Sequence, residues 1–514
     1  MTNRPIPAVG IDLGTTFSVV AILDDLGRPQ TLINAEGDKV TPSAVFFEGN
    51  NTVVGKEAIK AIATDAEQVA DCAKRELGDR VYHKVLNGRQ FPPEAIQAWV
   101  LNKLRLDSQR QIGNYDKVVI TVPAYFDEVR RKATQDAGYM AGFEVLDIIN
   151  EPTAAAIAFG FQRGFLHPGK DAGEKKRLLV YDLGGGTFDV TVMEIGARDF
   201  NALATDGDVQ LGGRDWDQRL LDFVAEEFIR VHRLDPREDP NTAGRLWRDC
   251  EDAKRTLSAR TKAMITCDFQ GKSVRLEVTR EKFQEITHDL LDRTAFTTKQ
   301  TLAAAGMTWQ DIDRVLLVGG SSRMPAVHQM LRDLSGKDPD RSVSPDEAVA
   351  HGAALHAGLI LQRSRGLPPS FHIKNVNSHS LGVVATDPAT RRPRNAILIP
   401  RNTPLPATAK RTFRTQKSNQ KSILVQIIEG ESPSPDDCSQ IGKCSVKTLP
   451  NNLPAQAPVE VLFRYAENGR LTVTVSVAEK QIRHEIQREN SLSRDQLESW
   501  RQYVSGLPPT VRKE

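Results

Sequence analysis

The chain has 514 residues, more than one hydrophobic core usually organises, so a single small module is excluded and at least two domains are expected. Hydrophobic residues make up 39% and charged residues 26%, which excludes the disordered and fibrous classes. The net charge of +2 excludes a dedicated nucleic-acid-coating protein, but it hides an asymmetry: residues 1–370 carry 47 basic and 53 acidic side chains, and residues 371–514 carry 21 and 13.

No targeting or membrane signal is visible. The N-terminus lacks the apolar region of a signal peptide, and no apolar run is long enough to cross a bilayer, so we expect a cytoplasmic protein without a membrane partner. Five scattered cysteines do not form a disulfide framework and are expected to be reduced thiols. Zinc, serine-hydrolase and P-loop signatures are all missing from the sequence.

Two segments with one pattern predict a duplicated first domain. Residues 9–23 and 178–192 each hold two apolar, β-branched stretches around an Asp-Leu-Gly turn that carries hydroxyl side chains. Each copy is followed at a distance by a helix of small residues, one from Asn150 and one opened by a Ser-x-x-Glu capping box at Ser344. We therefore expect an α/β domain whose halves face each other across a cleft and which ends near residue 363.

The rest of the chain predicts a different architecture. Residues 364–370 are rich in helix breakers and mark a boundary, and residues 371–490 show alternating strands with a hairpin turn at Asn468-Gly469, which predicts an antiparallel sandwich. A capping box at Ser493 predicts a short final helix over residues 494–504.

Four glycine-rich turns predict a phosphate-binding site in the first domain. Such turns let backbone N–H groups converge on phosphate oxygens, and neighbouring hydroxyls add donors. One turn alone would more often be structural, whereas four, two of them attached to an upstream Asp, favour a phosphate cradle. The turns are Gly14-Thr15-Thr16, Gly184-Gly185-Gly186-Thr187, Gly212-Gly213 and Gly319-Gly320-Ser321-Ser322-Arg323.

Carboxylates in or beside these turns predict a metal. They would repel a nucleotide's phosphates unless a divalent ion lay between, which favours Mg²⁺ with several waters retained. Each one taken singly has a turn-capping role as its alternative. These residues are Asp12, Glu151, Asp182 and Asp189.

One helix face has two interpretations. Residues 248–258 place four polar side chains at i, i+3, i+4 and i+7, and hence on one face. That face is either solvated or recognises adenosine, with Arg on the base and Glu or Lys on the ribose hydroxyls, and periodicity alone does not decide between these. The four are Glu251, Lys254, Arg255 and Ser258.

Six ordered motifs resemble those of the seventy-kilodalton heat-shock chaperones of the DnaK type. The similarity is strong over about residues 8–360 and weaker over 380–485. The motifs lie at residues 10–16, 121–126, 149–156, 181–189, 250–258 and 317–325.

The resemblance implies an α/β actin-like duplicated ATPase domain at residues 1–363 that hydrolyses ATP to ADP and phosphate with Mg²⁺ and K⁺. It further implies a linker at 364–379, an all-β antiparallel sandwich domain at 380–490 that binds unfolded or extended hydrophobic polypeptide, and a truncated lid helix with a tail at 491–514.

The resemblance also implies residue roles. Asp12, Glu151 and Asp182 would hold metal ions, mostly through water, and Thr15 and Thr187 would lie beside the γ-phosphate. Lys74 would contact the γ-phosphate and orient the attacking water, with Asp189 as a further water-positioning or proton-accepting carboxylate. The polar face of residues 251–258 is assigned to adenosine. The nucleotide pocket would be completed by Gly319, Gly320, Ser321, Arg323 and Asp346.

The resemblance implies two more sets of functional residues. Pro123 and Arg131 match residues that couple nucleotide state to the peptide domain. Peptide-binding strands would contain Phe413, Ile423, Val425 and Ile427, for some of which a place in the sandwich core is an equally good interpretation.

Four departures from the family limit this transfer. The chain is shorter between Arg80 and Ala95, so the outer part of the ATPase domain must be trimmed. Lys374 and Asn375 replace the leucine and the acid of the family's linker, which dilutes its apolar docking strand. Asp147 replaces the basic residue that meets a J-domain co-chaperone, which weakens that partner's fit. Finally, the lid is absent beyond residues 492–504, and there is no acidic tail.

The expected function is therefore an ATP-dependent molecular chaperone without a lid, with unfolded polypeptide and a nucleotide-exchange factor as partners. One alternative is a slow ATPase whose basic C-terminal region engages an acidic partner or RNA, although nucleic acid is the weaker expectation at +2. A small-molecule kinase of the actin-like superfamily is a third hypothesis, disfavoured because Lys74 and Asp189 match residues that act on water.

Overall fold

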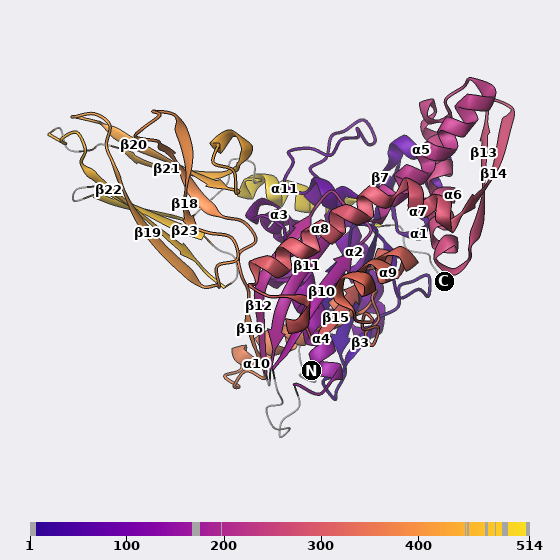
Figure 1. Ribbon diagram of the computed structural model, residues 1–514, viewed down its shortest axis with the longest axis horizontal. Helices are drawn as coiled ribbons and strands as arrows, with labels where there is room; N and C mark the ends of the chain where they lie inside the picture. Colours follow the sequence, from indigo (N-terminus) through magenta and orange to yellow (C-terminus); the bar gives the residue numbers. More distant parts are fainter. Residues whose placement is uncertain are drawn as a thin grey trace.

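The computed structural model describes residues 7–166, 175–196, 198–447, 449, 452–467, 471–477, 480–485 and 492–509. Figure 1 shows a large mixed α/β part and a smaller part built of strands, which the chain joins through β16 (His372–Lys374). The predicted turn at Asn468-Gly469 lies outside the described residues, although the two strands that flank it pair as expected.

Two sheets of the α/β part share one topology, which confirms the predicted pair of strand–turn–strand units. β1 is antiparallel to β2 and parallel to β8, and β10 is antiparallel to β11 and parallel to β15. The first sheet has the order β3-β2-β1-β8-β9, with β4 paired to β2; the second has the order β15-β10-β11-β12-β16. Their strands are β1 (Val9–Leu13), β2 (Phe17–Leu23), β3 (Pro29–Thr31), β4 (Thr41–Pro42), β8 (Lys117–Val122), β9 (Glu144–Asn150), β10 (Lys176–Leu183), β11 (Phe188–Ile195), β12 (Asp199–Asp208) and β15 (Arg314–Val318).

The two small-residue helices, α4 (Glu151–Gln162) and α10 (Ala348–Ser364), pack closely, as the sequence predicts. A Cβ on Gly352 would lie 1.8 Å from the carbonyl oxygen of Ala154, and one on Gly10 would lie 2.1 Å from the backbone nitrogen of Ala354. Only glycine allows these approaches. The predicted capping box at Ser344 is wrong: α10 begins at Ala348, because the Glu347 carboxylate instead accepts hydrogen bonds from Thr31 and Lys39.

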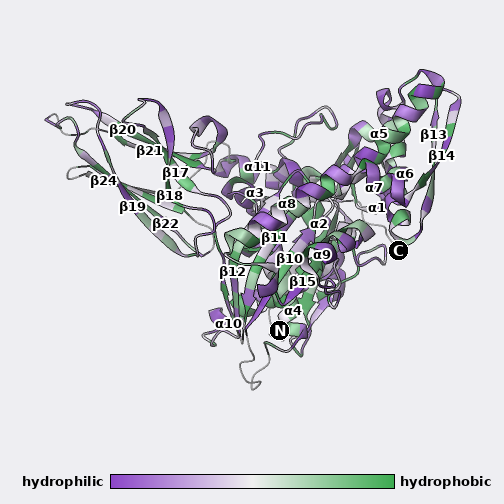
Figure 2. Ribbon diagram, viewed as in Figure 1, coloured by the Kyte–Doolittle hydropathy of each residue, from purple (hydrophilic) through white to green (hydrophobic). Residues whose placement is uncertain are grey.

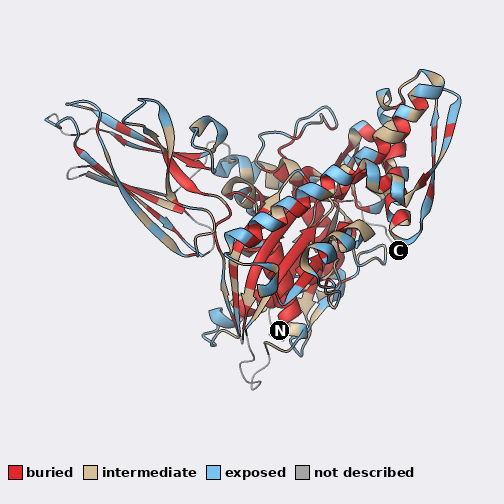
Figure 3. Ribbon diagram, viewed as in Figure 1, coloured by how far each residue is buried: buried red, intermediate tan, exposed pale blue. Residues whose placement is uncertain are grey.

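The remaining elements cover these sheets and build two outer arms. Figure 3 shows the central strands buried and the outward faces of the surrounding helices exposed. One arm belongs to the first half and carries the sheet β6-β5-β7; the other belongs to the second half and carries the hairpin β13-β14. The elements are β5 (Ala44–Glu48), β6 (Asn51–Val54), β7 (Val69–Asp71), α1 (Lys56–Ala61), α2 (Pro93–Ile112), α3 (Glu128–Met140), α5 (Gly213–His232), α6 (Pro240–Ala259), β13 (Lys262–Phe269), β14 (Lys272–Thr279), α7 (Arg280–Ile286), α8 (His288–Ala304) and α9 (Pro325–Ser335).

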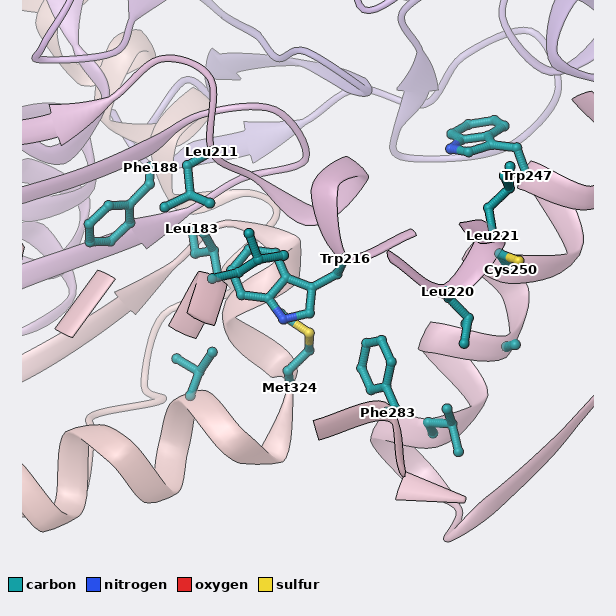
Figure 4. Close-up of a cluster of buried hydrophobic side chains, with 14 of the residues drawn as sticks. Leu183, Phe188, Leu211, Trp216, Leu220, Leu221, Trp247, Cys250, Phe283 and Met324 are labelled. Carbon is teal, nitrogen blue, oxygen red and sulfur yellow. The ribbon is translucent and has the colours of Figure 1, made fainter. Parts of the chain in front are cut away.

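A continuous apolar core supports the glycine turns of the second half. Figure 4 shows Trp216 pointing towards Met324, with Leu183, Phe188 and Leu211 beside them. These side chains are buried and come from strands, helices and turns that surround the cleft. Because packed interiors transmit small displacements, this core fixes the positions of the turns that it carries.

Among the residues that the structure describes, the strand-built part has two four-stranded antiparallel sheets, β18-β17-β20-β21 and β19-β22-β23-β24. Both sheets contribute side chains to one apolar core. In Figure 2 the hydrophobic positions of the molecule follow its strands, whereas the loops and outer helix faces are hydrophilic. The strands are β17 (Leu381–Thr386), β18 (Pro393–Ile399), β19 (Ala407–Arg414), β20 (Ser422–Glu429), β21 (Ser439–Lys447), β22 (Pro458–Tyr465), β23 (Leu471–Val477) and β24 (Lys480–Glu485).

The two parts are joined by a docked strand and by polar contacts. β16 pairs in parallel with the edge of β12, and the Phe371 ring lies 5.7 Å from that of Phe200, so the polar residues Lys374 and Asn375 do not prevent docking here. The Asn375 side chain accepts a hydrogen bond from Thr153 (3.0 Å). Further contacts join Arg401 to Asp206 (2.8 Å), Tyr465 to Glu128 (3.0 Å) and His379 to the carbonyl of Tyr125 (2.9 Å).

The final helix, α11 (Arg494–Gly506), begins at the predicted capping box and packs against α2 and α3 of the first half (Figure 1). Its Trp500 and Tyr503 rings hold the Arg89 guanidinium between them, at 4.7 and 4.6 Å, and both approach Phe91. Val504 is fully buried, and the Leu507 carbonyl accepts hydrogen bonds from Trp99 and Thr52, both 2.9 Å. The helix expected as a lid remnant thus completes the core of this half, beside the shortened segment 80–95.

No helix among the described residues is both long enough and apolar enough to cross a membrane. The five cysteines are all free thiols in the structure.

Candidate functional site

A cavity of about 370 Å³ lies between the two halves of the α/β part. Most of the residues predicted to bind nucleotide or metal line this cavity, although they are far apart in the sequence. Those that line it are Asp12, Gly14, Thr15, Thr16, Lys74, Glu151, Asp182, Gly184, Gly185, Thr187, Glu251, Lys254, Arg255, Ser258, Gly319, Gly320, Ser321, Arg323 and Asp346.

Four predicted residues lie one layer behind the cavity wall. A Cβ on Gly186 would meet the Thr15 side chain at 2.2 Å, and one on Gly212 would meet the Gly186 backbone at 2.5 Å. Gly213, at the start of α5, packs against Ser321 and donates its N–H to the Gly184 carbonyl (3.0 Å). Asp189 is the fourth.

The glycine turns of the two halves interlock at the base of the cavity. A Cβ on Gly185 would lie 2.1 Å from the Thr16 hydroxyl oxygen, and Gly319 has φ of 80° with no room for a side chain beside the Leu183 carbonyl. Gly185 is required because the Thr16 side chain leaves no room for a Cβ. Gly319 is required for the same kind of close approach and also because its φ is positive. The turns therefore present backbone N–H groups and hydroxyls to one enclosed space.

A buried group of carboxylates faces the Lys74 ammonium in this cavity. The Lys74 ammonium lies 2.6 Å from Glu151 Oε1, and the Asp12 carboxylate accepts a hydrogen bond from Thr121 (3.1 Å). Burial, followed by repulsion from Glu151, raises the pKa of Asp12 to about 7, and the same two causes raise the pKa of Asp182 well above its ordinary value. Negative charge is thus under-compensated here.

A hydrated divalent cation fits this donor set. Carboxylate oxygens suit Mg²⁺, and a cation would relieve the repulsion that raises these pKa values. Within the described residues, no group of three or more His, Cys, Asp and Glu side chains is arranged to hold a metal directly. That Asp12, Glu151 and Asp182 would hold a metal mostly through water stays a prediction.

Asp189 contacts the loop that precedes α3. Its carboxylate accepts hydrogen bonds from the backbone N–H groups of Ala124 (2.8 Å) and Tyr125 (3.2 Å), directly after Pro123. Burial, then repulsion from Glu151, raises the pKa of Asp189 to about 7. Arg131 donates to the Phe126 carbonyl (3.3 Å) and to the Asn150 side chain. Since His379 contacts the Tyr125 carbonyl, one loop touches both the carboxylate cluster and the strand-built part.

The polar face of α6 also lines the cavity. Glu251 and Arg255 pair at 2.5 Å, and the Arg255 guanidinium lies 5.2 Å from the centre of the Phe17 ring. Lys254 instead contacts the Asp217 carboxylate (2.7 Å) and the Gly213 carbonyl (2.9 Å). Arg323, which also lines the cavity, pairs with Asp346 at 2.5 Å. Arg255 and Arg323 both line the cavity, and a guanidinium can stack on a planar ring.

Arg214 and Asp217 line the cavity and were not predicted from the sequence. Both stand in the first two turns of α5, shortly after Gly212-Gly213, so the charged residues following that glycine pair were the available signal. Arg75, next to Lys74, is a further omission: its side chain donates to the Gly186 carbonyl (2.7 Å).

The predicted peptide-binding residues lie in the strand-built part. Ile423, Val425 and Ile427 alternate along β20 and are buried in its core, Phe413 is half-buried against the same core, and Leu424 between them is 56% exposed. This burial agrees with the core interpretation of the three β20 residues. Their contact with a peptide stays a prediction.

The carboxylate cluster predicts a pH dependence of stability. The folded pKa of Asp189, about 7, exceeds the ordinary value of 3.8, so the folded protein binds more protons than the unfolded chain between these values, and stability falls as pH rises through this range. Thermal unfolding of the nucleotide-free protein without Mg²⁺ should therefore show a falling Tm from pH 5 to 8. Asp189→Asn should reduce the slope, and a slope identical to that of the wild type would contradict the assignment.

Comparison with known proteins matches most of this chain to one family. The family model described as "Hsp70 protein" matches residues 8–87 and 79–503. Chaperone protein DnaK of Thermus thermophilus is 40% identical over 498 residues, which cover 91% of this chain and 78% of the relative. The DnaK proteins of Deinococcus proteolyticus and Deinococcus deserti are 39% and 38% identical, over 91% and 95% of this chain and 76% and 80% of their own lengths.

Proposed function

This chain belongs to the Hsp70 family, and on that premise we propose that it is an ATP-dependent molecular chaperone that hydrolyses ATP to ADP and phosphate. The observation that carries the proposal is the cavity between the duplicated halves, where interlocked glycine turns and one buried lysine face a carboxylate cluster. The comparisons support neither the RNA-binding alternative nor the kinase.

Each group of residues in the cavity has its own role in phosphoryl transfer. The turns at residues 14–16 and 184–187 bind the phosphates through backbone N–H groups and hydroxyls. Arg255 and Arg323 hold the adenosine end, where a guanidinium can stack on the base. Lys74, held by Glu151, contacts the γ-phosphate and orients the attacking water, so catalysis is mainly positioning and charge stabilisation. Bound Mg²⁺, held through water by Asp12, Glu151 and Asp182, would neutralise phosphate charge, and K⁺ is proposed beside it.

We assign an actin-like ATPase domain to residues 1–363, the linker to 364–379, a sandwich that binds extended hydrophobic polypeptide to 380–490, and the final helix and tail to 491–514. The docked β16 and the loop at residues 123–126 support coupling between the domains, through Pro123 and Arg131. A nucleotide-exchange factor is the expected partner of the ATPase domain.

The contact expected for a J-domain co-chaperone is altered. Asp147 lies 2.8 Å from His356 Nε2, so the acid that replaces the family's basic residue has its own partner within this chain. A standard J-domain would therefore meet a changed charge at this position. The cytoplasmic location stays a prediction.

The proposal is tested by ATP turnover and peptide binding in one preparation. The wild type should hydrolyse ATP and bind a labelled unfolded hydrophobic peptide, and Phe413→Ala should weaken peptide binding by about tenfold, or ~1.4 kcal/mol. The matched control is Phe296→Ala, which removes an exposed ring from α8 of the ATPase domain and should leave peptide affinity unchanged. Absence of hydrolysis would refute the ATPase, whereas hydrolysis without peptide binding would refute only the chaperone activity.

A further inference from the structure

An ion pair crosses the cleft between the outer arms of the two halves. Asp71, at the end of β7 in the first half, accepts a hydrogen bond from the guanidinium of Arg214, at the start of α5 in the second half. We call these two residues the cross-cleft pair. The Arg214 guanidinium also lies 4.6 Å from the centre of the Trp247 ring, so its orientation is fixed from α6 as well.

A second pair with reversed polarity stands beside the first. Arg75 of the first half binds Asp215 of the second half, and Asp215 also accepts the N–H of Gly212 (2.7 Å). Asp71 and Arg75 flank Lys74 in the sequence, so the segment that carries the lysine is held to α5 on both sides. Movement of one half away from the other must break both pairs.

The cross-cleft pair is largely removed from water. The side chains of Asp71 and Arg214 are 10% and 30% exposed. Burial by itself would raise the pKa of Asp71, but the charges of Arg214 and Lys84 outweigh burial and hold that pKa below its ordinary value. Separating the halves would break an ion pair that is shielded from water in the closed arrangement, where charges interact more strongly than at an exposed surface.

Arg214 connects this pair to the nucleotide cavity. Its side chain lines the cavity, and its backbone N–H donates to the Gly185 carbonyl (2.8 Å) in the phosphate turn. Asp71 and Arg214 together line a neighbouring cavity of about 630 Å³. The pair therefore stands between the nucleotide cavity and the space behind it.

We propose that the cross-cleft pair, Asp71 and Arg214, is a clamp between the two halves. It keeps them closed on bound nucleotide and limits the rate of nucleotide release. This inference rests on the proposed function, because it assumes that an adenine nucleotide occupies the cavity. Asp71 and Arg214 are positioning residues: they act on the closure of the cleft and on the segment that carries Lys74, and neither performs the chemical step.

The test is a double-substitution cycle with Asp71→Asn, Arg214→Gln and the double variant, measured as the release of fluorescent ADP after a chase with unlabelled ADP. Each single variant should release ADP at least tenfold faster than the wild type. The double variant should release it no faster than the single variants, because one interaction is being removed. The single-turnover rate constant of bound ATP should change less than the release rate, which a general loss of structure would not produce.

Two further variants keep the test decisive. Arg219→Gln removes an arginine from the same helix α5 whose partner, Asp289, lies in the same half, so release should stay at the wild-type rate. Arg214→Lys retains the charge and should partly restore slow release. ADP release at the wild-type rate from the double variant would overturn the clamp, and an acceleration equal to the product of the single effects would also overturn it. A wild type that binds no adenine nucleotide would instead refute the proposed function.

Discussion

Replacing Lys74 by alanine is expected to lower the rate constant of ATP hydrolysis at least a hundredfold while the protein still binds ATP. Lys74 is the buried ammonium that faces the carboxylate cluster, and removal of one preorganised charge from an enclosed site costs roughly 10²–10³-fold in rate. Binding should survive, because the glycine turns and the arginines at the adenosine end are untouched. Single-turnover hydrolysis and equilibrium binding of ATP separate the two quantities.

Lys103→Ala is the matched control for this substitution. Lys103 is as buried as Lys74, with a side-chain exposure of 2%, and it also contacts carboxylates, Asp107 at 2.8 Å and Glu36 at 3.0 Å, but it does not line the cavity. The Lys103→Ala substitution should destabilise the fold without lowering the hydrolysis rate per folded molecule. Equal hydrolysis by Lys74→Ala and the wild type would show that Lys74 has no catalytic role.

Replacing Trp500 and Tyr503 together by alanine is expected to destabilise the ATPase domain. Truncating buried aromatic residues costs ~3–5 kcal/mol each, and because these two rings are half-buried we expect about 2–4 kcal/mol for the pair. The loss includes the contacts with Arg89 and Phe91 and the packing of Val504. Thermal unfolding should show a Tm lower by about 5 °C or more.

This prediction separates two roles of α11. If the helix completes the core of the first half, the double substitution lowers the Tm and the affinity for ATP, and Arg494→Ala on the exposed start of the same helix changes neither. If the helix instead acts as a lid on the peptide domain, the unfolding of the ATPase domain stays unchanged and only peptide release becomes faster. The second result would contradict the core role.

Local sequence patterns were sufficient for features that depend on neighbouring residues. Asp-Leu-Gly turns between β-branched stretches predicted the two strand pairs, and the Ser493 capping box predicted the start of α11, because backbone preference and capping act within a few residues. The glycine turns predicted most of the cavity wall for the same reason. At Ser344 the same signal failed, because Thr31 and Lys39, more than 300 residues away, take the Glu347 carboxylate.

Only the tertiary structure decided which charges meet. Asp71 and Arg214 are 143 residues apart, and neither shows by itself that it has a partner across the cleft. Lys254 shares a helix face with Glu251 and Arg255, yet it turns to Asp217, which α5 brings within 2.7 Å. The final helix likewise has the same amphipathic pattern whichever surface it covers. Its place is set by Arg89, Phe91 and Trp99, because an apolar face packs against whichever complementary surface the fold leaves uncovered.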